Sequence, residues 1–357
     1  MNNENNRAKR VCASRPPMHG DKAERVLRPL PQKLEAIASF RVDKRMLVII
    51  LGLALLGASE AQTPAPAAGD QQFRFSTSVQ MVVLQTTVLN GKGAFARNLR
   101  QRNFTVFENA HQQAITLFSH NDSPVAIGLI IDNSGSMRRK HSAVLTAAKA
   151  FARNSNPKDQ LFIVNFNDKV TLGLAGAQPF SANSRDLERA IPPTAGGGKT
   201  ALYDALEAAL DHIHELKQDK KALILISDGG DNASSHSLEQ VINDATNSDV
   251  VIYTIGLFGK DEDETNPAFM ERISAVTGGE AFLPARPGQA ATSCRRIAQM
   301  IRSEYTLGYS PNGVESSKKF RAIRVNVATK SKEQLVARTR LGYTPSASIT
   351  TADGLEK

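Results

Sequence analysis

The chain has 357 residues, 41% of them apolar, which is enough for one to three globular domains with a real core. Lys and Arg outnumber Asp and Glu by 44 to 35, but more than half of this excess lies in residues 1–61, and no basic run interleaved with aromatics follows. This distribution argues against a nucleic-acid-binding protein. The only cysteines, Cys12 and Cys294, exclude a disulfide framework and a cysteine-rich zinc site, and Cys294 is expected to be a buried apolar thiol.

Residues 1–61 form a leader. Lys44 and Arg45 precede an apolar run at residues 46–57, and Ser59 and Ala61 supply the small residues of a cleavage site before Gln62. This pattern predicts a secretory signal peptide and export to the periplasm, the cell envelope or the extracellular space. The run is shorter than the roughly 20 residues of a membrane span, which favours a cleaved signal peptide. The alternative is an uncleaved N-terminal anchor, which is the one membrane association expected. Residues 62–71 read as a Pro/Ala linker.

Residues 72–120 are rich in β-branched and apolar residues and predict strands at 73–79 and 81–89. Further along, the segments 104–107 and 114–118 flank a polar break, and we expect them to pair as a hairpin.

Residues 122–300 alternate apolar runs with helical patterns. The runs predict strands buried on both faces at residues 125–131, 161–166, 222–226 and 250–255. Apolar residues at helical spacing predict helices near residues 144–152, 202–216 and 269–276, and residues 281–283 predict an edge strand. This alternation indicates an α/β fold with a doubly wound, mainly parallel sheet.

Residues 302–344 return to strand character, at 305–309 and in a pair formed by 320–327 and 335–341, before a polar tail at residues 345–357. Neither β-rich flank has enough strands to bury a good core alone. We therefore expect 72–120 and 302–344 to form one β-sandwich-like unit, with the α/β domain inserted in it or flanked by it.

Oxygen-bearing side chains follow two of the predicted strands and end a glycine-rich loop. Asp132-Asn-Ser134-Gly-Ser136 follows the first strand of the α/β zone, Asp228 follows the strand at 222–226, and Thr200 ends Gly196-Gly-Gly-Lys-Thr200. Ligands of open α/β sheets bind beyond the carboxyl ends of the strands, so these segments can meet at one edge. Hydroxyl and carboxylate oxygens favour Mg²⁺, or Mn²⁺ or Ca²⁺, over zinc or copper.

Together the three motifs resemble the metal-ion-dependent adhesion site of von Willebrand factor type A domains, over about residues 122–300. More loosely, the flanks resemble those of bacterial, acidobacterial-type exported proteins that carry such domains. The resemblance implies that Ser134, Ser136 and Thr200 ligate the metal and that Asp132 and Asp228 hold it directly or through water. Lys199 departs from the small residue common in the family and is a candidate contact for an anionic partner.

Other interpretations of these residues are weaker. A phosphate-loop assignment of residues 193–200 fails because Pro193 stands in the first glycine position and no strand precedes it. Asp231 is expected to be a turn residue or to support the metal ligands without binding the metal itself, and Asp204 is expected to be a local helix or packing residue. His212 and His214 are two residues apart on one helix, so they cannot share a metal, and both are expected to be solvated.

These patterns predict an exported, non-catalytic protein that captures a protein or peptide partner with an acidic side chain through the bound cation. The alternative is a structural or scaffolding envelope protein in which the metal only stabilises the fold. An enzyme has little support, because no nucleophile elbow and no general base beside a metal-bound water is apparent.

Overall fold

The computed structural model describes residues 81–174, 179–194, 196–259, 265–311, 319–330 and 334–345. At its centre is a six-stranded sheet with the order β10-β9-β8-β5-β6-β7. All neighbouring strands pair in parallel except β6 and β7. The strands are β5 (Val125–Asp132), β6 (Gln160–Phe166), β7 (Val170–Leu172), β8 (Lys220–Ser227), β9 (Val250–Gly256) and β10 (Ala281–Phe282). The doubly wound α/β fold predicted from the sequence is confirmed.

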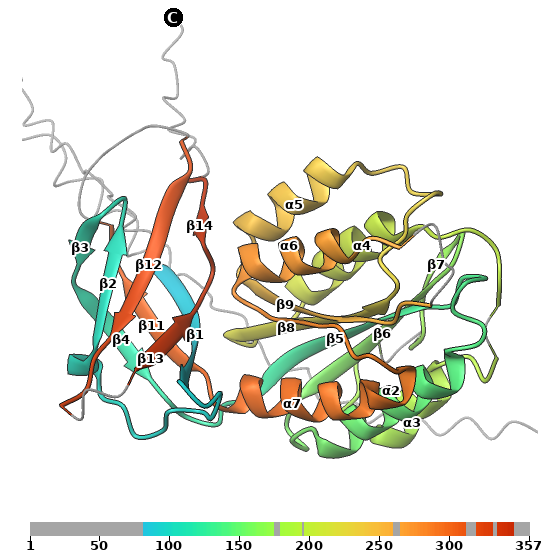
Figure 1. Ribbon diagram of the computed structural model, residues 1–357, viewed down its shortest axis with the longest axis horizontal. Helices are drawn as coiled ribbons and strands as arrows, with labels where there is room; N and C mark the ends of the chain where they lie inside the picture. The colour runs from blue at the N-terminus through green and yellow to red at the C-terminus, as the bar shows by residue number, and fades with distance from the viewer. Residues whose placement is uncertain are drawn as a thin grey trace, which may run out of the picture. The chain divides into compact units, whose positions relative to one another are not determined.

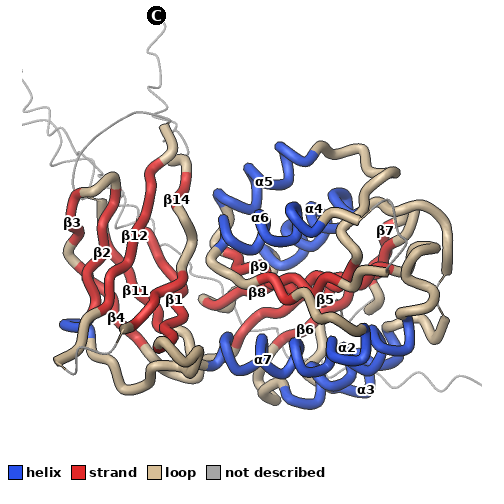
Figure 2. The backbone as a smooth tube through the Cα atoms, in the orientation of Figure 1, coloured by secondary structure: helices blue, strands red, loops and turns tan. Residues whose placement is uncertain are grey.

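Helices cover both faces of this sheet, with α4, α5 and α6 on one side and α2, α3 and α7 on the other (Figures 1 and 2). Each face has its own core: Leu206 packs in one and Phe151 in the other. The helices are α2 (His141–Asn154), α3 (Ser184–Ala190), α4 (Leu202–His214), α5 (Leu238–Asn247), α6 (Pro267–Thr277) and α7 (Ala290–Arg302). Cys294 of α7 is fully buried, as expected.

The flanking segments form two antiparallel four-stranded sheets, in the orders β13-β1-β11-β4 and β14-β12-β2-β3. Each sheet takes strands from both flanks. Leu84 and Leu307 of one sheet share a hydrophobic core with Val106 and Val325 of the other, which makes the pair a sandwich. The strands are β1 (Val82–Asn90), β2 (Phe104–Glu108), β3 (His111–Gln113), β4 (Ile115–Ser119), β11 (Tyr305–Tyr309), β12 (Arg321–Val327), β13 (Leu335–Arg338) and β14 (Gly342–Tyr343). The segment limits drawn from the sequence stay predictions.

Two strand pairings expected from the sequence are wrong. The polar break after β2 is itself part of a hairpin: β2 pairs with β3 across Asn109 and Ala110, which both have positive φ, as in a two-residue turn. Strand β4 then pairs with β11 in the other sheet. Likewise β13 pairs with β1, whereas β12 pairs with β2 and β14. Sequence-adjacent strands change sheet here, which is ordinary for a sandwich.

Other expectations lie outside the described residues, namely the strand at 73–79, the signal peptide, the linker and most of the tail. In the part of the chain that the structure does describe, none of the helices has the length and apolar character needed to cross a membrane.

A buried acid lies at the start of β11. Glu304 is 4% exposed, and the Tyr253 hydroxyl donates a 2.7 Å hydrogen bond to its carboxylate. Burial raises the pKa of Glu304 to about 7, although the Tyr253 hydrogen bond and the charges of Lys220 and Arg302 act in the opposite direction. Between about pH 4.3, the pKa of an unfolded glutamate, and about pH 7, the folded chain therefore keeps a proton on Glu304 that the unfolded chain has lost.

We expect this acid to make stability fall with rising pH. Its contribution is fully present below about pH 4, and about 3 kcal/mol is lost as the pH rises through about 7. A Glu304→Gln variant keeps a hydrogen-bonding side chain without the titration, so its unfolding free energy should change less over this window. Urea unfolding at several pH values measures the difference between the two proteins. Equal slopes would show that Glu304 does not titrate as described.

Candidate functional site

The first segment of the candidate site is the loop that follows β5. Asp132 is fully buried at the strand end, where its carboxylate accepts hydrogen bonds from the Ser134 backbone amide at 2.9 Å and from the Ser227 hydroxyl at 2.6 Å. Burial raises the pKa of Asp132 to about 6, and the hydrogen bonds from Ser134 and Ser227 oppose this shift. The Ser134 and Ser136 hydroxyls lie 3.2 Å apart, so the turn brings both side chains to one place.

The glycine-rich loop docks on this first loop. The Gly135 amide donates to the Gly198 carbonyl at 3.2 Å, and the Gly197 amide donates to the Asn133 carbonyl at 3.0 Å. Gly197 and Gly198 both have a φ of +93°, and a side chain at Gly198 would collide with the Asp168 carboxylate. Glycine is therefore required for the close approach that places Thr200 beside the β5 loop.

Thr200 itself is held through its backbone. Its amide donates to the Asn232 side chain at 2.9 Å, and its carbonyl accepts from the Asn232 amide at 2.9 Å. Thr200 is 7% exposed, and its hydroxyl makes no hydrogen bond to any of the described residues. A hydroxyl oxygen that no other group of the protein occupies is available as a ligand.

Asp228 follows β8, the neighbour of β5, and is 3% exposed. Its carboxylate lies 3.3 Å from the ammonium of Lys140, which is 4% exposed at the start of α2. Lys140 was not predicted as a site residue, because a lysine before a helix carries no signal of its own. Ser227 and Asn232, which hold Asp132 and Thr200 in place, were not predicted either.

The structure thus brings all five predicted ligands, Asp132, Ser134, Ser136, Thr200 and Asp228, to connected loops at the carboxyl end of the parallel strands. Within the described ranges, no three His, Cys, Asp or Glu side chains come together as a metal-binding group. The donors at this edge are hydroxyls and carboxylates, with one hydroxyl unpaired, and such a set fits a hard divalent cation. Lys199 is exposed next to Thr200, on the solvent side of the loop.

The remaining polar residues of the region have local roles. Asp231 accepts from the Tyr203 amide at 3.1 Å, and Asp204 accepts from the Ser235 and His236 amides, so both tie α4 to the loop after β8. The expectation that His212 is solvated is wrong. His212 is 7% exposed because its ring stacks on Phe180, whereas His214 is exposed, as expected, and lies 3.4 Å from Asp249.

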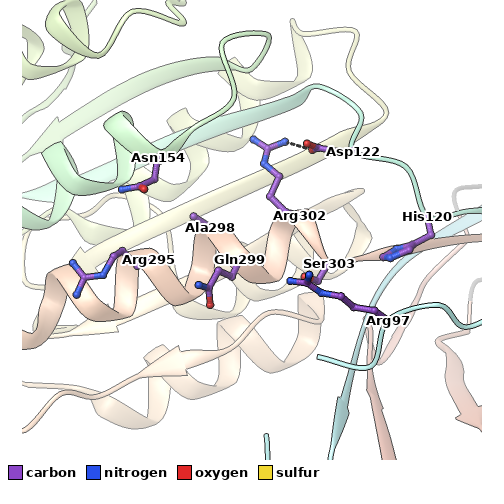
Figure 3. A pocket seen from close by; sticks show the side chains of 9 residues that line it. All are labelled: Arg97, His120, Asp122, Asn154, Arg295, Ala298, Gln299, Arg302 and Ser303. Atoms are coloured by element: carbon purple, nitrogen blue, oxygen red, sulfur yellow. Dashed lines mark hydrogen bonds and ion pairs between the residues drawn. The ribbon is translucent and has the colours of Figure 1, made fainter. Parts of the chain in front are cut away.

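A separate cavity of about 490 Å³ lies near the opposite end of the sheet, lined by residues that include Arg97, Arg295 and Arg302 (Figure 3). Arg302 is already paired there, with Asp122 at 2.8 Å and with buried Asp159. This cavity lacks the hydroxyl and carboxylate set found beyond β5 and β8, so the loop edge is the candidate site.

Comparison with known families agrees with this architecture. The family model of the von Willebrand factor type A domain matches residues 126–291, which span β5 to the start of α7. Residues 126–291 form a von Willebrand factor type A domain. Such domains are generally non-enzymatic adhesion or interaction modules, and they commonly bind a divalent metal. In this chain the domain lies between the two segments that build the sandwich.

Three solved structures illustrate the range of similar proteins. A von Willebrand factor type A protein from Catenulispora acidiphila is 13% identical and has a TM-score of 0.46, with 74% of this chain and 73% of that chain covered. The corresponding domain of the type V pili tip protein Mfa5 from Porphyromonas gingivalis is 15% identical, with 51% and 96% covered and a TM-score of 0.42. Proximal thread matrix protein 1 from the mussel byssus, described with a zinc occupied MIDAS motif, is 18% identical, with 54% and 49% covered and a TM-score of 0.45. No curated protein matches the chain significantly.

Proposed function

We propose that this protein is an exported, non-catalytic binding protein whose von Willebrand factor type A domain captures a protein or peptide through a divalent cation. The observation that carries the proposal is the gathering of three loops beyond β5 and β8, with a Thr200 hydroxyl that bonds to no described residue. Mg²⁺ suits the oxygen donors best, with Mn²⁺ or Ca²⁺ as alternatives.

The proposed ligands leave room for a partner. Octahedral Mg²⁺ takes about six oxygens, and Ser134, Ser136 and Thr200 supply at most three. Asp132 and Asp228 would hold the cation directly or through water. At least one position then remains for an outside oxygen, and a carboxylate of an incoming Asp or Glu fits it in charge and size. Lys199, exposed beside Thr200, adds attraction for an acidic side chain.

Export rests on the leader alone. The basic residues Lys44 and Arg45, the apolar run at 46–57 and the small residues before Gln62 support a cleaved signal peptide. An uncleaved anchor at the same run would instead hold the binding domain at the outer side of a membrane.

The second candidate is a structural envelope protein in which the cation only stabilises the loops. Hydrogen bonds between the loops favour this structural role. Gly135 bonds to Gly198 and Ser227 bonds to Asp132, so the three segments are already joined through protein atoms. A stabilising cation would raise the thermal midpoint without making partner binding depend on it.

Capture of partners from envelope extracts tests the proposal. Bound protein should be recovered in Mg²⁺ and lost in chelator, and Thr200→Ala should lose it in Mg²⁺ as well, because one metal ligand is missing. Thr292→Ala, an exposed threonine of α7, is the matched control and should bind as wild type does. Capture that is equal in Mg²⁺ and in chelator, and equal for Thr200→Ala, would contradict metal-bridged binding. Loss of circular dichroism signal in chelator would favour the structural role.

A further inference from the structure

The ion pair between Lys140 and Asp228 places a fixed positive charge inside the candidate metal site. The Lys140 ammonium and the Asp228 carboxylate are 3.3 Å apart, and both side chains are 5% exposed. Lys140 is positioned by its backbone, since its amide donates to the Met137 carbonyl at 2.9 Å and its carbonyl accepts from the Ala143 amide at 2.9 Å. The lysine is therefore built into the turn that leads from Ser136 to α2.

The charges at this edge determine how the ion pair between Lys140 and Asp228 affects binding of a cation. Asp132 and Asp228 are the two buried carboxylates among the proposed ligands. One of them is compensated by Lys140 before any cation arrives. With a divalent cation present, two carboxylates face three positive charges, and the buried part of the site carries a net charge of about +1 by simple addition. Without Lys140 the same sum is zero.

We propose that Lys140 is a specificity-determining residue of the metal site, which weakens binding of the cation alone and makes the loaded site select an anionic ligand. The inference rests on the proposed function. A cation must share Asp228 with a buried ammonium, so its affinity is lowered by repulsion that water does not screen. A carboxylate that enters the site removes the excess positive charge. Cation and carboxylate ligand therefore bind with positive coupling, each tightening the other.

Among the residues that the structure describes, the other charged groups named near the site are exposed. Lys199 and Arg138 are exposed on the surrounding loops and add positive charge near the rim. Asp168 lies beside Gly198, but its side chain is exposed to solvent, where screening weakens its effect. The buried ammonium is the group whose charge the cation meets directly at Asp228.

The test is calorimetric titration of the full chain with Mn²⁺, in chloride and in acetate as a carboxylate probe. Wild type should bind Mn²⁺ at least threefold more tightly in acetate. Lys140→Met should bind Mn²⁺ at least tenfold more tightly than wild type in chloride and gain less from acetate than wild type does. Lys140→Arg keeps the charge and should keep the acetate dependence. Lys158→Met, a matched change of an exposed lysine between α2 and β6, should leave Mn²⁺ affinity in chloride within twofold of wild type.

Removal of Lys140 leaves the buried Asp228 carboxylate without its ion-pair partner, so the thermal midpoint of Lys140→Met without metal should fall. Mn²⁺ should raise this midpoint by more than it raises that of wild type. Equal or weaker Mn²⁺ binding by folded Lys140→Met, or equal wild-type affinity in chloride and acetate, would overturn the role of Lys140 while leaving the metal site intact. Absence of Mn²⁺ binding in wild type and all variants would instead overturn the proposed function, and this inference with it.

Discussion

Replacement of Asp132 by alanine is expected to lower the affinity of the site for Mg²⁺ or Mn²⁺ by about 100-fold or more. Loss of a group that only orients a metal ligand typically costs about 10- to 100-fold in affinity, and Asp132 contributes both orientation and charge. Its carboxylate fixes the Ser134 amide and the Ser227 hydroxyl at 2.9 and 2.6 Å. The change would therefore remove a negative charge and release two hydrogen-bond donors at once. Calorimetric titration of the purified chain measures the effect.

Asp132→Asn separates these two contributions. Asparagine can still accept from Ser134 or Ser227 but carries no charge, so affinity should remain at least about tenfold below wild type while the loop keeps its shape. Asp249→Asn changes an exposed carboxylate before β9 and should bind metal as wild type does. Circular dichroism should show all three variants folded, because the buried strands do not depend on these oxygens. Wild-type affinity in folded Asp132→Ala would contradict the site.

Deletion of the residues after Pro311 is expected to unfold the sandwich and leave the von Willebrand factor type A domain folded. The deletion removes β12, β13 and β14, which belong to both sheets. Strand β2 then loses its pairing with β12, and the shared core loses Ile323 and Val325. The strands that remain cannot form two closed faces, and isolated hairpins are marginal in water. Limited proteolysis should digest the segment 81–120 and leave a fragment close to residues 122–302.

A shorter deletion of residues 346–357 provides the control, because every described strand is retained. This protein should resist proteolysis as the full chain does. Protection of residues 81–120 in the longer deletion would show that the N-terminal flank folds alone, and the sandwich would then not be a unit shared by both flanks.

The sequence was sufficient to predict the α/β domain because its strands are buried on both faces and so read as unbroken apolar runs. Strand β5 is buried at every position, and its run at residues 125–131 is unmistakable. Helices α3, α5 and α7 were not predicted from the sequence, since polar and charged residues interrupt their apolar positions. In α7 the buried apolar residues are Ala290, Cys294, Ile297, Met300 and Ile301, which recur at helical spacing. That spacing was a usable signal.

Pairing in the sandwich could not be predicted in the same way. The alternation of residues 104–118 is compatible with β2 pairing to β4 or to β3, and the choice depends on a turn at Asn109 and Ala110 in which a non-glycine residue takes positive φ. Alternation of apolar and polar residues also predicts where strands lie but not which sheet each strand joins. Strand β13 pairs with β1 and not with its sequence neighbour β12.

At the site, motif spacing predicted which loops would meet, because parallel strands deliver their carboxyl ends to one edge. It could not predict that a lysine would lie among them. The contact of Lys140 with Asp228 joins residues 88 positions apart, and it arises only when the turn after Ser136 folds over the end of β8. Lys140 can therefore be recognised as a site residue only from the geometry of the folded chain.

Diffraction from crystals soaked in Mn²⁺, recorded for anomalous scattering, shows directly whether a cation binds at the loop edge. We expect one strong anomalous peak beyond the carboxyl ends of β5 and β8, within about 2.0–2.6 Å of oxygen atoms from Ser134, Ser136 and Thr200. The peak should be absent from crystals of Thr200→Ala grown and soaked in the same way. A well-ordered loop edge without a peak, or a peak bound by other residues, would contradict a metal-dependent binding site at this position.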